Sequence, residues 1–261
     1  SWQSIDFSET INAYFSAKLL DRDLNLNLPP VILQENSKEQ VWSAVSKFGG
    51  DDQLKLPLGK TAVSFAQFDN HYDDESFKKY SKDFNVFKKD LFENKANEAV
   101  IDLELPSELT INGPIELEIR LKLNDSKGLL SAQILDFGPK KRLEDKARVK
   151  DFKVLDRGRN FMLDDLVELP LVESPYQLVT KGFTNLQNKD LLTVSDLKAD
   201  EWFTLKFELQ PTIYHLEKAD KLRVILYSTD FEHTVRDNRK VTYEIDLSQS
   251  KLIIPIESVK K

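Results

Sequence analysis

The chain has 261 residues, 40% of them hydrophobic and 31% charged, which is typical of a globular protein with a substantial core. Its net charge of −7 is spread along the sequence, so charge gives no reason to expect binding to nucleic acid or to an anionic membrane. The sequence has no apolar run long enough to span a membrane. It contains no cysteine, which excludes disulfides and thiol chemistry and fits a cytoplasmic protein.

The first residues predict a helix. Residues 1–6 contain neither an initiator methionine nor a signal sequence, so we expect the chain to be part of a longer protein, with a processed mature protein as the alternative. Asp6 and Glu9 have the spacing of a capping box, and Pro29 and Pro30 prevent the helix from continuing. Between them the apolar residues recur at helical intervals, at Phe7, Ile11, Tyr14, Phe15 and Leu19.

A second helical stretch is predicted at about residues 73–94. Its apolar positions share one face, at Phe77, Tyr80, Phe84, Phe87 and Leu91, and lysines surround that face. One interpretation is a basic amphipathic helix that binds a membrane or a partner. The preferred one is a surface helix docked by its aromatic stripe, because nearby acidic residues offset the lysines.

The rest of the chain is dominated by strand patterns with no crossover helices between them. Apolar and polar residues alternate most regularly in residues 203–211 and 241–247, as in strands with one wet face and one buried face. Further strands are predicted at residues 31–33, 100–105, 115–123, 129–135, 149–155 and 222–227, with residues 36–42 as a loop or turn and 56–59 as a connector. This composition predicts a mainly β protein, a sandwich or jelly roll.

The glycine positions exclude two common catalytic motifs. The eight glycines stand at 49, 50, 59, 113, 128, 138, 158 and 182. No two are four residues apart, so the nucleophile elbow of α/β-hydrolases is absent, and no two are two apart, so the dinucleotide fingerprint is absent. Gly59-Lys60-Thr61 resembles the end of a phosphate-binding loop, but Leu54 stands where that loop needs its first glycine.

The three histidines are the candidate bases or metal ligands. His71 lies in a polar loop, His215 near a strand end and His233 in a turn-like segment. No two are close in sequence and there is no thiolate, so a structural zinc site is not expected. A Ser-His-Asp triad is defined by geometry rather than sequence, yet no serine stands out as activated. We therefore assign no catalytic, cofactor-binding or metal-binding residue.

Paired carboxylates and tryptophans give two weaker signals. Asp51-Asp52 and Asp164-Asp165 are pairs of the kind that hold calcium in some jelly rolls, and the preferred interpretation is a turn or helix cap. Exposed tryptophans form sugar platforms in binding modules. Of the three tryptophans here, Trp2, Trp42 and Trp202, the last begins the most regular strand and is expected in the core.

Several segments, in order along the chain, resemble one peptidase family. Residues 2–9 are similar to the segment that follows the catalytic histidine of Xaa-Pro dipeptidyl-peptidases. Residues 29–42, 127–136 and 209–231 are similar to their C-terminal β-domain. The resemblance extends to the wider group that includes cocaine esterase and the α-amino-acid ester hydrolases.

The resemblance implies an architecture and an activity. Residues 1–28 would be the terminal helix of a missing α/β-hydrolase domain, and residues 29–261 a galactose-binding-like jelly roll with the helical insertion at 73–94. Family members release Xaa-Pro dipeptides with a catalytic Ser, Asp and His that all precede the position of Trp2, so no catalytic residue is expected here. The resemblance also implies a cytoplasmic homodimer without cofactors, in which this domain walls the substrate cleft.

The resemblance also gives expectations for two local regions, and two alternative functions stay open. Phe7, Tyr14 and Phe15 should leave an apolar patch in the isolated chain, and residues 230–233 are the best candidates for contact with the active-site mouth. The first alternative is an independent jelly-roll module that binds a carbohydrate or a protein. The second is a self-contained hydrolase with an unrecognised triad.

Overall fold

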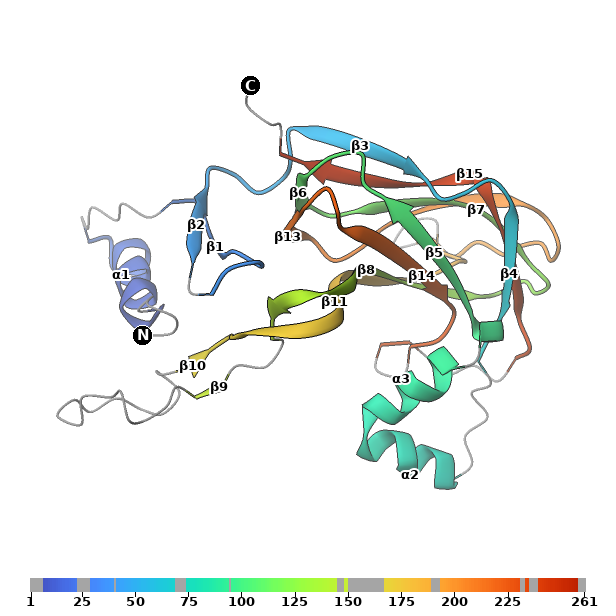
Figure 1. Cartoon of the computed structure of the whole chain (residues 1–261). Helices are drawn as coiled ribbons and strands as arrows, with labels where there is room; N and C mark the ends of the chain where they lie inside the picture. Colours follow the sequence, from blue (N-terminus) through green and yellow to red (C-terminus); the bar gives the residue numbers. More distant parts are fainter. Residues whose placement is uncertain are drawn as a thin grey trace. The chain divides into compact units, whose positions relative to one another are not determined.

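The computed structural model describes residues 7–22, 29–39, 41–68, 74–93, 95–144, 148–149, 167–188, 193–230, 233–234 and 239–257. The chain divides into two compact units. Unit 1 is Ser1–Phe48 with Pro139–Pro175, and unit 2 is Gly49–Gly138 with Tyr176–Lys261. Strands make up most of the described chain (Figure 1).

Unit 2 contains two antiparallel sheets, although residues 139–143 of β8 and 171–175 of β11 belong to unit 1. The four-stranded sheet has the order β11 (Leu171–Asn185), β8 (Leu129–Leu143), β14 (Lys221–Tyr227) and β5 (Glu98–Glu104). The seven-stranded sheet has the order β12 (Phe203–Glu208), β7 (Glu116–Leu123), β15 (Thr242–Ile256), β6 (Leu109–Gly113) and β13 (Thr212–Leu216), and β3 (Asp52–Pro57) and β4 (Ala62–Ala66) also pair with β15. This β-sandwich confirms the predicted fold class.

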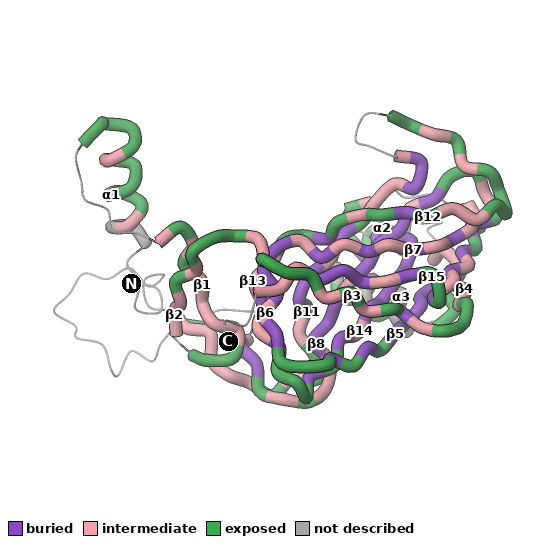
Figure 2. The backbone as a smooth tube through the Cα atoms, turned by 90° about the horizontal axis from the view of Figure 1, so that it is seen from above, coloured by how far each residue is buried: buried purple, intermediate pink, exposed green. Residues whose placement is uncertain are grey.

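The alternation of the sequence builds the core between the two sheets. On β7 the residues Leu117, Ile119 and Leu121 are fully buried, while the charged residues between them are only half-buried. On β14 the residues Leu222 and Val224 occupy the same core. Figure 2 shows buried and more exposed positions following one another along these strands. The core therefore follows directly from the alternation of apolar and polar residues along each strand.

Strand β15 joins most of the seven-stranded sheet. Its first part pairs with β4 and its second with β3, while β7 runs along its other side. The register with β7 shifts between Asp246 and Lys251, which marks a β-bulge. The Ser250 hydroxyl holds this bulge: it donates to the Asp246 carbonyl oxygen at 2.6 Å and accepts from the Arg120 backbone N–H at 2.9 Å.

The predicted helical insertion consists of two helices rather than one. Helix α2 (Asp74–Lys82) ends before Asp83, and α3 (Phe84–Glu93) begins after it. The Asp83 carboxylate accepts a hydrogen bond from the Asn85 backbone N–H at 3.0 Å, which caps α3. Tyr80 and Phe87 are buried against the four-stranded sheet, which supports the docked surface helix over the membrane-binding one. Phe77, Phe84 and Leu91 lie outside the described side chains.

Unit 1 contains a helix and short strands. They are α1 (Phe7–Leu19), the hairpin of β1 (Val31–Gln34) and β2 (Trp42–Val45), and the pair β9 (Arg148–Val149) and β10 (Val167–Glu168). Within this unit the Leu171 backbone N–H donates to the Glu39 carboxylate at 2.7 Å. Most of the strand predicted at residues 149–155 lies outside the described residues, whereas the helix at the start and the strand at 31–33 are confirmed.

Other local predictions were wrong. Residues 56–59 were expected to be a connector, but Leu56 belongs to β3 and pairs with Leu252. Strands β2, β4, β6, β10, β11 and β13 were not predicted, and Trp42, expected in a loop or turn, begins β2. Strand β11 contains Pro175, which breaks the usual strand pattern but is tolerated because β11 is the end strand of its sheet.

Replacement of Gly50 should disrupt the pairing at the end of β15. A Cβ at this position would lie 2.7 Å from the backbone nitrogen of Ile256 and closer still to its carbonyl oxygen, so main chain would have to move. We expect Gly50→Ala to lower the free energy of unfolding by about 2 kcal/mol or more, measured by urea denaturation. Gln53→Ala, at an exposed position of β3, is the control and should stay within about 0.5 kcal/mol. Equal effects of both variants would contradict this packing.

Candidate functional site

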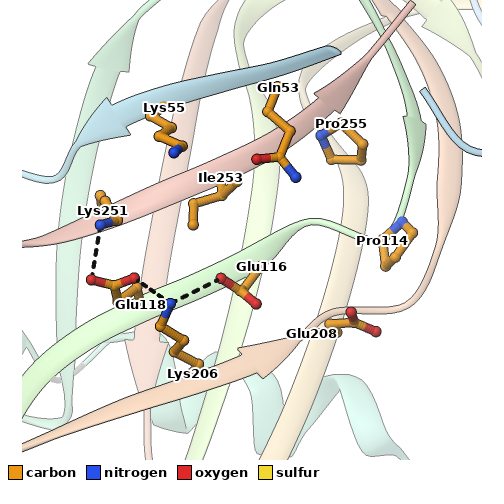
Figure 3. Close-up of a pocket in the computed structure, with 10 residues that line it drawn as sticks. All are labelled: Gln53, Lys55, Pro114, Glu116, Glu118, Lys206, Glu208, Lys251, Ile253 and Pro255. Carbon is orange, nitrogen blue, oxygen red and sulfur yellow. Dashed lines mark ion pairs between the residues drawn. The ribbon is translucent and has the colours of Figure 1, made fainter. Parts of the chain in front are cut away.

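The outer face of the seven-stranded sheet carries a polar hollow of about 360 Å³. Strands β3, β15, β7 and β12 contribute its floor, and charged side chains rise from them (Figure 3). Its lining residues are Gln53, Lys55, Pro114, Glu116, Glu118, Lys206, Glu208, Lys251, Ile253 and Pro255. All of them belong to unit 2.

Opposite charges face each other across three strands in this hollow. Lys206 and Lys251 both stand directly opposite Glu118 in the register of the sheet. The Glu118 carboxylate lies 2.8 Å from the Lys206 ammonium and 2.9 Å from the Lys251 ammonium (Figure 3). Hydrogen bonds from Lys206, which has the larger effect, and from Lys251 hold the pKa of Glu118 below its ordinary value.

A second part of the hollow brings two carboxylates together. Glu208 stands directly opposite Glu116, a like-charge pairing that is unfavourable in an antiparallel sheet. The Glu116 carboxylate is 3.9 Å from the Lys206 ammonium, beyond hydrogen-bonding distance. The described lining contains no histidine and no serine, so these residues offer no nucleophile paired with a base.

A larger hollow, of about 570 Å³, lies beside strand β12. Trp202, one of its lining residues, was expected in the core, and that prediction was wrong. The residue is only half-buried and lies just before β12, where the Lys122 ammonium is 4.9 Å from its ring centroid. Lys122 also pairs with Glu244 at 2.9 Å. Trp202 is thus part of a cation–π contact on the surface rather than of the hydrophobic core.

The described histidines occupy structural positions. His215 on β13 lies opposite Thr110, with 3.1 Å between its Nδ1 and the Thr110 hydroxyl. His233 stacks on Phe183, with 5.4 Å between the ring centroids, and its Nε2 is 3.1 Å from the Lys181 ammonium. A charged ammonium donates here, so Nε2 acts as the acceptor. His71 lies outside the described residues.

Asp230 organises the turn that carries His233. Its buried carboxylate accepts from the His233 backbone N–H at 3.0 Å and from the Tyr227 hydroxyl at 3.3 Å. Its backbone N–H donates to the Thr234 hydroxyl at 2.9 Å. These bonds account for the carboxylate as a turn-forming group. Contact of residues 230–233 with an active-site mouth stays a prediction.

Of the two carboxylate pairs, Asp51-Asp52 lies at the start of a strand and the other is not described. Asp52 accepts from the Gln53 backbone N–H at 2.8 Å, at the start of β3, while Asp164 and Asp165 lie outside the described residues. The described residues contain no cluster of three His, Cys, Asp or Glu able to hold a metal ion. Within the same part of the chain, no helix combines the length and apolarity needed to cross a membrane.

Helix α1 of unit 1 has a different surface. Tyr14 and Phe15 are 48% and 50% exposed, and Ile11 and Leu19 are also exposed. The two rings contact each other edge-on at 5.9 Å between centroids. The predicted apolar patch is confirmed for Tyr14 and Phe15, while the side chain of Phe7 lies outside the described set. Exposed apolar patches of this kind mark interaction surfaces.

Comparison with solved structures defines the class of fold. The sandwich resembles that of a CocE/NonD family hydrolase from Staphylococcus aureus, with a TM-score of 0.58 and 14% identity over 96% of this chain and 45% of the other. It also resembles an aminopeptidase from a Thaumarchaeota archaeon (TM-score 0.60, 11% identity, 95% and 43% coverage) and an α-amino acid ester hydrolase (0.59, 12%, 95% and 44%). At these identities the likeness concerns the fold alone.

Sequence comparison defines the family. Residues 26–258 match the family model described as the X-Pro dipeptidyl-peptidase C-terminal non-catalytic domain, and the chain belongs to this family. It is 47% identical over 257 residues to an Xaa-Pro dipeptidyl-peptidase of Streptococcus gordonii. That alignment covers 98% of this chain and 34% of the relative, so the chain spans about a third of the relative's length.

The charge pairs of the polar hollow should stabilise the fold in a pH-dependent way. We expect Glu118→Gln to lower the free energy of unfolding by about 0.5 to 1 kcal/mol at pH 7. Because the folded-state pKa of Glu118 is lowered, its contribution is present above the ordinary glutamate pKa and is lost as the pH falls through the lowered value. The difference from the wild type should therefore vanish in acid, as measured by urea denaturation at several pH values.

Glu116→Gln is the matched control on the same strand. Its carboxylate faces Glu208 and forms only a long ion pair of 3.9 Å with Lys206, so repulsion and attraction offset each other and neutralising it should change stability by less than about 0.5 kcal/mol at pH 7. A loss equal to that of Glu118→Gln, or a loss independent of pH, would contradict the assigned pairing.

Proposed function

We propose that this chain is the C-terminal β-domain of a serine peptidase that releases Xaa-Pro dipeptides from peptide N-termini. The observation that carries the proposal is the 47% identity over 98% of this chain to a relative of which it covers 34%. The family description as non-catalytic supports a division of labour in which the catalytic Ser, Asp and His lie in polypeptide that precedes this chain. The missing nucleophile elbow agrees with that division.

The two-part organisation is proposed on the same basis. Residues 1–28 form the terminal helix of the catalytic domain, and residues 29–261 form the β-domain with its helical insertion at about 73–94. The exposed Tyr14 and Phe15 support this, because a helix that belongs to another domain presents its apolar face to that domain. In the whole protein this helix packs into the catalytic domain and the β-domain walls part of the substrate cleft.

The proposed cellular setting follows from the family and the composition. The substrates are peptides with proline at the second position, and the whole protein acts as a cytoplasmic homodimer without a cofactor. The absence of cysteine supports a reducing compartment.

Hydrolysis of chromogenic dipeptide amides tests the activity. The full reading frame that contains this chain should cleave an Xaa-Pro amide and discriminate strongly against the matching Xaa-Ala amide. This chain alone, with its β-structure checked by circular dichroism, should cleave neither. Such a result fits a non-catalytic domain of a proline-specific peptidase.

The remaining outcomes separate the alternatives. If the full protein cleaves neither amide, the proposal fails and an independent binding module becomes the better account. If this chain cleaves the amide by itself, a triad lies within it, and serine-to-alanine scanning would locate the nucleophile.

A further inference from the structure

The two outer faces of the sandwich in unit 2 differ in chemistry. On the seven-stranded sheet, many outward positions are charged, and several of them pair with opposite charges on neighbouring strands. Lys206, Glu118 and Lys251 form one row, and Lys122 with Glu244 forms another. A face of this composition is well suited to water and gives no reason to expect a covering domain.

The alternation along each strand identifies the side chains on the outer face of the four-stranded sheet. Leu222, Val224 and Leu226 of β14 point into the inter-sheet core, so Arg223 and Ile225 point outward. The same alternation places Val100 and Asp102 of β5 and Leu135 and Phe137 of β8 on the outer face, since Ile101 and Ile134 are in the core. On β11, Val179 is in the core, so Leu178 points outward with Tyr176 two residues before it.

Part of this outer face is covered by the helical insertion. Tyr80 of α2 and Phe87 of α3 pack against Leu135, Ile225 and Tyr227, and all five side chains are buried. Tyr80 and Phe87 meet edge-on at 5.4 Å between ring centroids. Burial raises the pKa of Tyr80 to about 12, and its hydroxyl donates to Asp90 at 2.9 Å. The sheet therefore has an apolar outer face that the chain itself covers at one end.

The rest of the face is open and of mixed character, because four apolar side chains lie there together with the charged Asp102, Glu104, Lys221 and Arg223. We name Val100, Phe137, Tyr176 and Leu178 the open apolar band. Tyr176 is 53% exposed, Leu178 40% and Val100 38%, and Phe137 is half-buried.

Two of the charges in this region, Arg223 and Asp102, neutralise each other. Arg223 binds the Asp102 carboxylate through two hydrogen bonds of 2.6 and 2.8 Å. The same guanidinium lies 3.4 Å from the ring centroid of Phe137. The bidentate ion pair and the ring stack hold Arg223 flat on the sheet, which leaves a surface that a rigid partner can cover.

We propose that the open apolar band is a docking surface for the catalytic domain that precedes this chain. The inference rests on the proposed function. The family is described as a C-terminal domain, and the Streptococcus gordonii relative has about two-thirds of its length outside the match, so a large covalently attached partner is available. Attachment makes its effective concentration high, and contacts of this mixed apolar and ion-paired kind are typical of interfaces between domains of one chain.

Photo-crosslinking in the full-length protein tests this directly. Benzoylphenylalanine is introduced in place of Tyr176, a substitution close in shape and at an exposed position. The control carries it in place of Thr204, an exposed residue of β12 on the charged outer face of the other sheet. After irradiation, mass spectrometry locates the adduct, and mixing isotope-labelled with unlabelled protein separates contacts within one chain from those between copies.

The expected result is an adduct between position 176 and sequence that precedes this chain. The control at position 204 should form no adduct with that preceding sequence. An adduct between labelled and unlabelled copies would identify a second copy as the occupant and overturn the proposal. An adduct confined to these 261 residues, or no adduct at all, would also overturn it.

A pair of charge insertions gives an independent readout in the same full-length protein. Leu178→Glu should lower Tm by about 2 °C or more, because the new carboxylate would be buried at a domain contact. Thr204→Glu should leave Tm unchanged. Equal Tm values for both variants would contradict docking at the band.

The two proposals fail separately. If the full protein does not cleave the Xaa-Pro amide but position 176 crosslinks to preceding sequence, the docking surface stands and the proposed activity falls. If it cleaves the amide while position 176 gives no such adduct, the activity stands and the docking surface falls.

Discussion

The fold of unit 2 depends on one constraint: each strand has two faces, and the core between the sheets takes one of them. Strand β7 shows this most simply, since Leu117, Ile119 and Leu121 enter the core and Glu118 faces outward. A slip of one residue would bury the charged row and expose the leucines, so burial fixes the register. Strand β15 extends the constraint, because its bulge at Asp246–Lys251 lets it pair with β3, β4 and β7.

The same constraint decides what each surface can do. Side chains that could act in catalysis or ligand binding instead stabilise the fold. Asp230 forms a turn, His215 lies beside Thr110, and Glu118 binds two lysines. In the described residues these groups are spread over separate elements rather than gathered at one point.

Sequence alone predicts the local parts of this structure and leaves the long-range parts open. Alternation identified the strands around residues 115–123 and 203–208, and helical spacing identified α1, because both periods are local. Strand β3 was missed because its partner in β15 lies about 200 residues away, and β11 because Pro175 interrupts its pattern. The break at Asp83 depends on a single cap that the continuous aromatic stripe conceals.

The polar hollow likewise depends on long-range pairing that the sequence does not reveal. Glutamates and lysines alternating on β7 and β12 are visible in the sequence, but the contact of Glu118 with Lys251 requires the register of β15 beyond its bulge. Trp202 was misplaced for a related reason. Its position at the start of a regular strand suggested the core, whereas its place beside Lys122 depends on pairing between β12 and β7.

We propose that this chain supports a peptidase without performing its chemistry. The most direct measurement is to label the full-length protein with a fluorophosphonate, which reacts covalently with activated serines, and to identify the labelled peptide. We predict a single labelled serine in sequence that precedes this chain. A label on any serine among these 261 residues would contradict the account.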